Sequence, residues 1–175
     1  MSVYIILAVI VVIILWFIGG YNSFIKLKNR VEEGFATMDV YLKKRFDIIP
    51  NLVGAVKGYA SHEKETLAAV IEARNKAGSS SKIDDRVISE NQITGALGKL
   101  FALAENYPNL KADSQFLDLQ RQLETVETDI AQSRKYYNAV VKEFNTKCEM
   151  FPASIIAKIF SFPQPSPPKT HLIRR

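Results

Sequence analysis

The sequence predicts an all-α protein in which one N-terminal transmembrane helix continues into an antiparallel four-helix bundle of long helices. Three observations predict this fold. The chain opens with an unbroken apolar run at residues 3–18. Most of the remaining chain repeats apolar side chains every three or four positions, which is the period of a helix. No segment alternates apolar and polar residues for long enough to indicate a strand.

The apolar run at residues 3–18 is long enough to cross a bilayer. Uncharged residues continue past Tyr21, and about nineteen helical residues at about 1.5 Å each measure about 28 Å, close to the ~30 Å hydrocarbon core of a membrane. A cleaved signal peptide is disfavoured, since no basic residue precedes the run and no A-x-A site follows it. We therefore expect residues 1–21 to form an anchor that contacts the lipid bilayer through residues 3–21.

The charges that flank the run predict its orientation. Lys26, Lys28 and Arg30 follow it closely, with Lys43, Lys44 and Arg45 somewhat beyond, whereas no basic side chain precedes it. The positive-inside rule then places the short N-terminus outside and the bundle in the cytoplasm.

The bundle is expected at residues 22–152. A first stripe runs from Phe24 to Ile49 in steps of three and four residues, and we expect a bend near Asp47, where this residue caps a new helix opened by Pro50. The second helix then runs to a Gly-Ser loop at residues 78–81, and glycines allow a kink near residues 58–62.

Two further helices complete the predicted bundle. The third begins at Asp84 or Asp85 and ends ahead of Pro108. The fourth carries a heptad-like stripe from Phe116 to Phe151 without internal glycine or proline, so it requires partner helices. Residues 153–175 form a short apolar segment, 155–162, followed from Pro163 by a proline-rich, basic tail that we expect to be disordered.

Composition and charge exclude several classes of protein. A chain of 175 residues with 47% apolar residues is not a disordered polymer and has room for one domain with accessories. Its single cysteine, Cys148, excludes a disulfide framework and a cysteine-based zinc cluster. The net charge of +5 lies mostly in the last segment, so the nearly neutral body lacks the basic face that nucleic-acid binding requires. We expect no nucleic-acid partner.

Several residue clusters stand out in the sequence: Asp47-Ile48-Ile49-Pro50-Asn51-Leu52, Lys57-Gly58-Tyr59, His62-Glu63, Tyr107-Pro108, Tyr137-Asn138 and Phe151-Pro152. With these clusters the chain resembles the LemA family of bacterial membrane proteins from Tyr21 to about Pro152. The chain departs from the family at Gly34-Phe35, where Ala-Trp is usual, and after Phe162. The resemblance implies a helical bundle behind one span in the bacterial plasma (inner) membrane, with a short outward N-terminus. It implies no assigned biochemical activity.

The sequence offers few groups for chemistry. His62-Glu63 resembles the start of a zinc-protease HExxH, but the second histidine is missing, and His171 lies in the tail. Cys148 lies beside the fourth stripe, where a small buried filler is favoured over a nucleophile. We therefore predict no catalytic, cofactor-binding or metal-ligating residues and no cofactor.

Six carboxylates are spaced so that some face inward: Glu32, Asp39, Asp47, Glu63, Glu105 and Glu127. No Glu-x-x-His pair exists to form a di-iron site. Ion pairs with Arg45, Arg74 or Arg134 would account for inward carboxylates, because an unpaired buried charge is costly.

The favoured function is a membrane-tethered scaffold or adaptor that acts through contacts with other proteins. The alternative is association with anionic lipid through the basic tail, where Lys169, Arg174 and Arg175 each contribute about 1 kcal/mol near a charged surface. An uncharacterised enzyme is the third hypothesis. Homo-oligomerisation through the long helices stays open, because the charges flanking the stripes show no clear pairing pattern.

Overall fold

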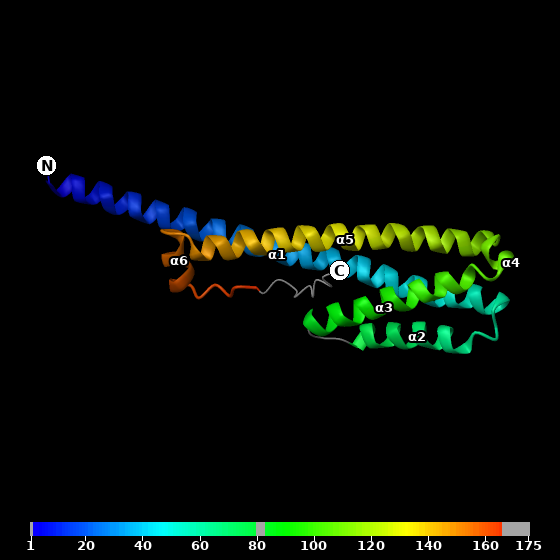
Figure 1. Cartoon of the computed structure of the whole chain (residues 1–175). Helices are drawn as coiled ribbons and strands as arrows, with labels where there is room; N and C mark the ends of the chain where they lie inside the picture. The colour runs from blue at the N-terminus through cyan, green and yellow to red at the C-terminus, as the bar shows by residue number, and fades with distance from the viewer. Residues whose placement is uncertain (1, 80–82, 166–175) are drawn as a thin grey trace. The chain divides into compact units, whose positions relative to one another are not determined.

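A computed structural model describes residues 2–79 and 83–165, and within these ranges the fold is all-α, as predicted (Figure 1). The helices are α1 Ser2–Tyr59, α2 Lys64–Ser79, α3 Ile83–Ala104, α4 Pro108–Lys111, α5 Ser114–Glu149 and α6 Ala153–Ile159. The chain divides into two compact units. Of the described residues, unit 1 contains those up to Met38 and 133–165, and unit 2 contains those within Asp39–Gln132. The four-helix-bundle arrangement and its boundaries stay predictions.

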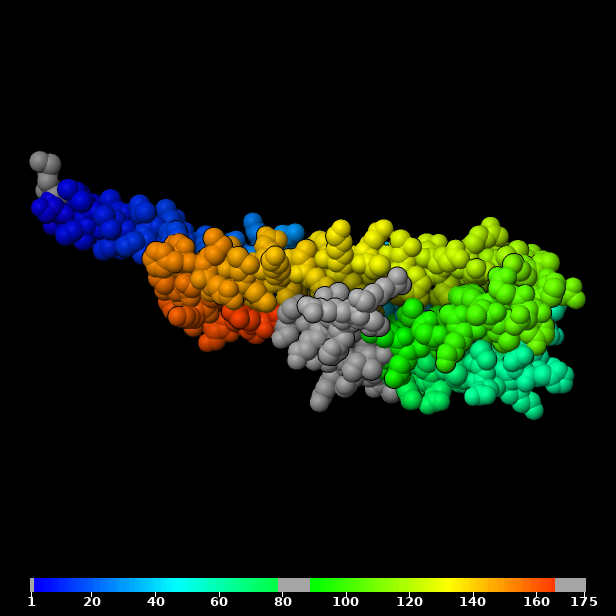
Figure 2. All heavy atoms as spheres, viewed as in Figure 1, coloured from blue at the N-terminus to red at the C-terminus, as the bar shows by residue number. Residues whose placement is uncertain are grey.

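The first helix, α1, extends unbroken over 58 residues. Its N-terminal part holds a window of mean hydropathy 2.9, none of which is buried. In Figure 2 this part is drawn in blue, and no other segment packs on it on the face shown. Gly19 and Gly20 lie within the helix, so the candidate membrane span passes directly into the packed part of unit 1. The helix boundary predicted at Asp47 is wrong, since α1 continues through Pro50 to Tyr59.

Unit 1 packs the predicted stripe of α1 against α5. Phe24, Leu27 and Val31 are buried together with Val140 and other apolar residues of α5. Gly34 marks a close approach of the two helices, because a Cβ added there would lie 3.3 Å from a ring carbon of Tyr136.

The apolar segment after Pro152 forms α6, a short helix that packs into unit 1. Ile156 is fully buried, and a Cβ added at Gly20 would lie 2.3 Å from its Cδ1 atom. Phe160 and Phe162 follow the helix and contact Tyr21 and Phe24 of α1, with ring centroids 4.6 and 4.9 Å apart. The chain can form a helix here because Pro152 lies ahead of the first helical residue and the next proline, Pro163, comes after the last one.

The predicted disorder from Pro163 onward does not hold for its first residues. The backbone carbonyl of Pro165 accepts a hydrogen bond from Asn145 Nδ2 at 3.0 Å, which holds this part of the chain against α5. The rest of the predicted tail lies outside the described residues, including Lys169, His171, Arg174 and Arg175.

Unit 2 combines the second half of α1 with α2, α3, α4 and the first half of α5. Its core contains Leu52 and Val56 of α1, Val70 of α2, Leu100 of α3 and Leu123 of α5. The kink expected near residues 58–62 is a complete break, after which the chain reverses into α2 (Figure 1).

The later helix boundaries follow the sequence closely. The third helix begins at Ile83, one or two residues before the predicted start at Asp84 or Asp85, and ends at Ala104, ahead of Pro108. The short α4 was not predicted. Asp113 then caps α5, since its Oδ1 accepts a hydrogen bond from the backbone amide of Phe116 at 2.8 Å. The Tyr59 hydroxyl donates to Oδ2 of the same carboxylate at 3.0 Å, which joins the end of α1 to the start of α5.

Candidate functional site

A buried arginine, Arg45, lies at the centre of a cluster of hydrogen-bonded polar side chains in unit 2. Its side chain is 2% exposed, and Nη1 pairs with Glu90 Oε2 at 2.7 Å. Nη2 donates to Thr94 Oγ1 at 2.7 Å and pairs with Glu127 Oε1 at 2.7 Å. We call these four residues the Arg45 cluster. The cluster joins α1, α3 and α5 through charged hydrogen bonds, which are stronger than neutral ones.

The cluster is only partly shielded from solvent. The Glu90 side chain is 6% exposed, whereas that of Glu127 is 37% exposed. Thr94 Oγ1 also donates to the carbonyl oxygen of Glu90 at 3.1 Å, which fixes the hydroxyl that receives Arg45. Arg45 Nε is buried and has no hydrogen-bond partner among the described residues.

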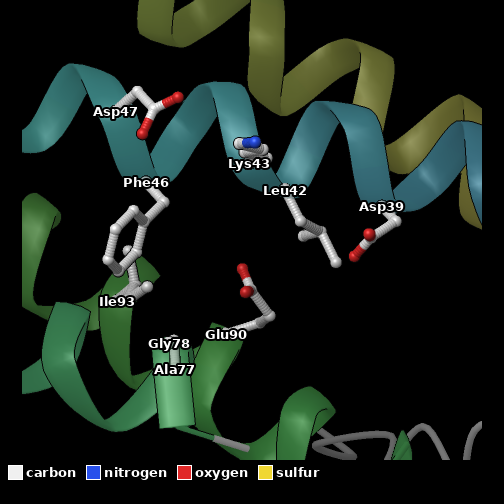
Figure 3. Close-up of a pocket in the computed structure, with 9 residues that line it drawn as sticks. All are labelled: Asp39, Leu42, Lys43, Phe46, Asp47, Ala77, Gly78, Glu90 and Ile93. Atoms are coloured by element: carbon white, nitrogen blue, oxygen red, sulfur yellow. The ribbon is translucent and has the colours of Figure 1, made fainter.

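A pocket of about 290 Å³ lies next to the cluster in unit 2. Leu42, Phe46 and Ile93 form its apolar wall, and Figure 3 shows Glu90 pointing into it from α3. The charged residues that line it are Asp39, Lys43, Asp47 and Glu90. The Glu90 carboxylate that lines this pocket is the one that pairs with Arg45.

Arg74 of α2 explains how α1 continues through a proline. Pro50 has no amide hydrogen, so the carbonyl of Phe46, four residues earlier, loses its helical partner. Arg74 Nε donates to that carbonyl oxygen at 3.1 Å. The guanidinium carbon also lies 3.7 Å from the centroid of the Phe46 ring, a cation–π contact. A side chain from another helix therefore replaces the hydrogen bond that proline removes.

The two side chains singled out for reactivity in the sequence, His62 and Cys148, belong to different units. His62 is exposed in the turn between α1 and α2, and its neighbour Glu63 accepts a hydrogen bond from the Tyr107 hydroxyl at 3.0 Å. Cys148 is buried in unit 1, as expected of a filler, and burial raises the pKa of its thiol. Among the described residues, no group of three or more His, Cys, Asp or Glu side chains is placed to hold a metal ion.

The six candidate carboxylates lie in different places. Glu127 pairs with Arg45, as predicted. Glu32 lies 3.7 Å from Lys28, and Glu105 pairs with Lys111, both on the surface. Asp39 and Asp47 line the unit 2 pocket, and Glu63 contacts Tyr107. Of the predicted arginine partners, Arg74 binds a carbonyl instead, and Arg134 is half-buried on α5.

Glu90 was missed in the sequence, although a signal for it exists. Arg45 lies three residues after Leu42 and four before Ile49, so this charged residue shares the apolar face of α1 with them. Glu90 stands three residues before Ile93 on the stripe of α3. Opposite charges on the buried stripes of two helices indicate a buried ion pair.

Unit 1 carries a second cavity, a groove of about 880 Å³ between α1 and the end of α5. We call it the basic groove, because Lys26, Arg30, Lys142 and Lys147 line it and Glu143 is its one acidic residue. Glu143 pairs with Arg30 at 3.2 Å. Lys147 contacts the Ser23 hydroxyl and lies over the Phe24 ring, 5.1 Å from its centroid.

The described residues thus define a membrane-associated all-α protein with a long apolar N-terminal helix and buried polar groups that join its helices. Residues 34–167 match the LemA family, and the chain belongs to this family.

Relatives of this chain include Protein LemA of Metamycoplasma hominis, which is 25% identical over 146 residues. The alignment covers 81% of this chain and 65% of that protein. Magnetosome protein MamQ 2 of Paramagnetospirillum magneticum is 23% identical, with 81% of this chain and 62% of the relative covered. Magnetosome protein MamQ of Magnetospirillum gryphiswaldense is 24% identical over the same shares. The chain spans less than two thirds of the length of each relative.

Proposed function

We propose that this protein is a scaffold anchored in the bacterial inner membrane, which acts through contacts with other proteins and not by catalysis. The continuity of α1 carries this proposal. One helix contains the candidate membrane span and the buried stripe of unit 1, so no flexible linker separates the anchor from the folded part. A domain fixed in this way presents its surface at a set height and direction relative to the membrane.

The internal contacts support a structural role for the buried charges. The Arg45 cluster joins three helices and satisfies its carboxylates with a guanidinium from the same chain. Arg74 replaces a missing helical hydrogen bond. These arginines therefore stabilise the helices around them, and the outer faces are left for partners.

We further propose that the N-terminus lies outside and the folded part lies in the cytoplasm, with Lys26, Lys28 and Arg30 on the inner side. The test is cysteine labelling in whole cells. Cys148→Ser removes the native thiol, and Gln122→Cys provides an exposed one on α5. A membrane-impermeant maleimide should label this variant only after lysis. Labelling in intact cells would place the folded part outside.

The scaffold proposal is tested by photo-crosslinking in cells. A benzophenone amino acid placed at Val40 or Ile71, which are exposed apolar residues of unit 2, should give discrete adducts with other proteins. The same group at Gln92, an exposed polar position, is the control. Adducts that appear at all three positions equally, or at none, would contradict a defined partner surface. Adducts containing only a second copy of the chain would indicate self-assembly instead.

A further inference from the structure

Five apolar side chains near the C-terminal end of unit 1 are exposed although they lie close together in the sequence. Met150 and Ile159 are each 59% exposed, and Phe151 is 81% exposed. We call the whole group the apolar foot: Met150, Phe151, Ile155, Ile159 and Phe160. Single exposed apolar residues are ordinary, but five large ones within eleven consecutive residues indicate a surface that is covered in the working protein.

The amphipathic pattern of α6 gives this exposure a direction. Ile156 and Ala157 point into the core of unit 1. Ile155 and Ile159 are four residues apart and therefore share the opposite, uncovered face, with exposed Lys158 between them. A helix with a buried face and a second apolar face requires apolar surroundings on both sides.

The contacts of α6 place the apolar foot at the end of the membrane span. Phe160 lies against Phe17 and Tyr21, with ring centroids 5.8 and 4.6 Å away, and Ile156 lies over Gly20. The apolar run ends at Ile18, so these contacts fall within one helical turn of its end. At this depth the hydrocarbon core gives way to headgroups, where amphipathic helices bind.

The basic groove borders the apolar foot on the side away from the span. Met150 and Phe151 line the groove together with Lys26 and Lys142. Lys26 follows Ile18 by eight residues, which corresponds to about 12 Å along the helix and reaches the headgroup layer. Because Glu143 is paired with Arg30, the groove is positively charged overall.

We propose that the apolar foot enters the same bilayer as residues 3–18, and that the basic groove holds the headgroup of an anionic phospholipid. The occupant follows from continuity with the span, since α6 packs on the last turn of the apolar run. The apolar side chains replace water with acyl chains, and the lysines meet phosphate. The contact rests on the membrane anchor of the proposed function, but it requires no protein partner, so it can hold or fail separately from the scaffold role.

The apolar foot is tested in proteoliposomes with the full chain. In a Cys148→Ala background, an environment-sensitive fluorophore is attached through Phe151→Cys or Ile159→Cys, and Leu117→Cys, an exposed apolar position of unit 2, is the control. We expect blue-shifted emission at the two foot positions and strong quenching by lipids that carry a spin label near the headgroup.

The other outcomes identify the other occupants. Blue-shifted emission that depends on protein concentration and is not quenched by spin-labelled lipid would show that a second copy covers the foot, which overturns the proposal. Emission typical of water at both positions would also overturn it. Equal quenching at Leu117→Cys and at the foot positions would show that lipid contact is not specific to the apolar foot, which would overturn the proposal as well.

The basic groove is tested through Trp16, the single tryptophan of the chain. Energy transfer from Trp16 to pyrene-labelled phosphatidylglycerol should exceed transfer to pyrene-labelled phosphatidylcholine. The Lys26→Gln/Lys142→Gln variant should bring the ratio close to one, and Lys57→Gln/Lys135→Gln, which removes equal charge from exposed positions outside the groove, should preserve it. Equal transfer in the unsubstituted protein, or an equal fall in both variants, would overturn the headgroup site.

Discussion

The contact between Arg74 and the carbonyl of Phe46 gives a prediction that separates a structural hydrogen bond from a surface charge. In the native chain, Arg74→Met removes the 3.1 Å hydrogen bond and the cation–π contact while it keeps most of the apolar stem. A hydrogen bond from a charged donor contributes about 1.5–3 kcal/mol, and an exposed cation–π contact contributes about 0.5–1 kcal/mol. We expect Arg74→Met to lower the free energy of unfolding by about 2–4 kcal/mol.

The same substitution should cost much less after Pro50→Ala. An alanine at this position supplies the amide hydrogen that proline lacks, so the Phe46 carbonyl regains its partner within α1. Only the ring contact is then lost, and Arg74→Met should cost about 1 kcal/mol or less. The difference between the two backgrounds is the coupling energy of Arg74 with Pro50, at least about 1 kcal/mol.

The assay is urea unfolding of the full chain in detergent micelles, followed by far-UV circular dichroism, for the four members of this cycle. Lys76→Met is the control, because Lys76 lies on the same helix and pairs with Glu72 on the surface. Its effect should be small and equal in both backgrounds. If Arg74→Met costs the same with and without Pro50, the guanidinium does not replace the missing helical bond and the reasoning fails.

Three further predictions follow from the packing and the charges. Gly20→Leu should displace α6 and raise hydrogen exchange in residues 153–162, whereas Gly19→Leu, with nothing within 4 Å of an added Cβ, should leave that exchange unchanged. Arg45→Met should lower the free energy of unfolding in urea by about 3–5 kcal/mol, because it leaves the buried carboxylate of Glu90 without its cation. Glu127→Gln should cost far less, because the Glu127 side chain is half-exposed. The hydrogen bonds to Asp113 lower the pKa of its carboxyl. Its contribution to stability is therefore complete at neutral pH and is lost as the pH falls through the lowered pKa. Melting temperatures measured from neutral to acidic pH should fall less steeply for Asp113→Asn than for the unsubstituted protein. Equal exchange in the two glycine variants, equal costs of the two cluster variants, or parallel melting curves would each contradict the corresponding argument.

The regular parts of this fold were predictable because apolar period and helix-breaking residues act locally. Most of the stripe of α1 from Phe24 to Ile49 and of the stripe of α5 is buried as the spacing indicates, with Phe35 and Phe46 partly buried and Phe151 exposed as the exceptions. The end of α3 ahead of Pro108 follows from the steric restriction on the residues that precede a proline.

The errors arose where a distant side chain decides a local question. Pro50 reads as the start of a helix, yet Arg74 supplies the hydrogen bond that lets α1 pass through it. Residues 155–162 were predicted only as a short apolar segment, and no local pattern indicated that Gly20 leaves the space that Ile156 fills. Both compensations come from residues at least twenty positions away, which a local pattern does not contain.

The candidate sites were less predictable than the helices. The pairing of Arg45 with Glu127 was among the expected ion pairs, but Glu90 was not considered. The basic groove is formed by lysines and arginines of α1 and α5 that are about a hundred positions apart, and each of them reads alone as an ordinary surface charge. Their convergence depends on the antiparallel register of the two helices.

The unbroken helix through Gly19 and Gly20 also fixes a rotational phase. Each residue of an α-helix turns the chain by about 100°. Phe17, Gly20 and Phe24 lie on one face of α1, and α6 packs on this face, so the side of the span that is in line with α6 is fixed. One residue inserted between the span and Phe24 would turn unit 1 by about 100° about the helix axis, whereas seven would nearly restore its direction. A transmembrane neighbour that binds one side of the span therefore has unit 1 on a defined side of it. Replacing the span by another transmembrane helix would preserve this direction only if the helical phase were preserved.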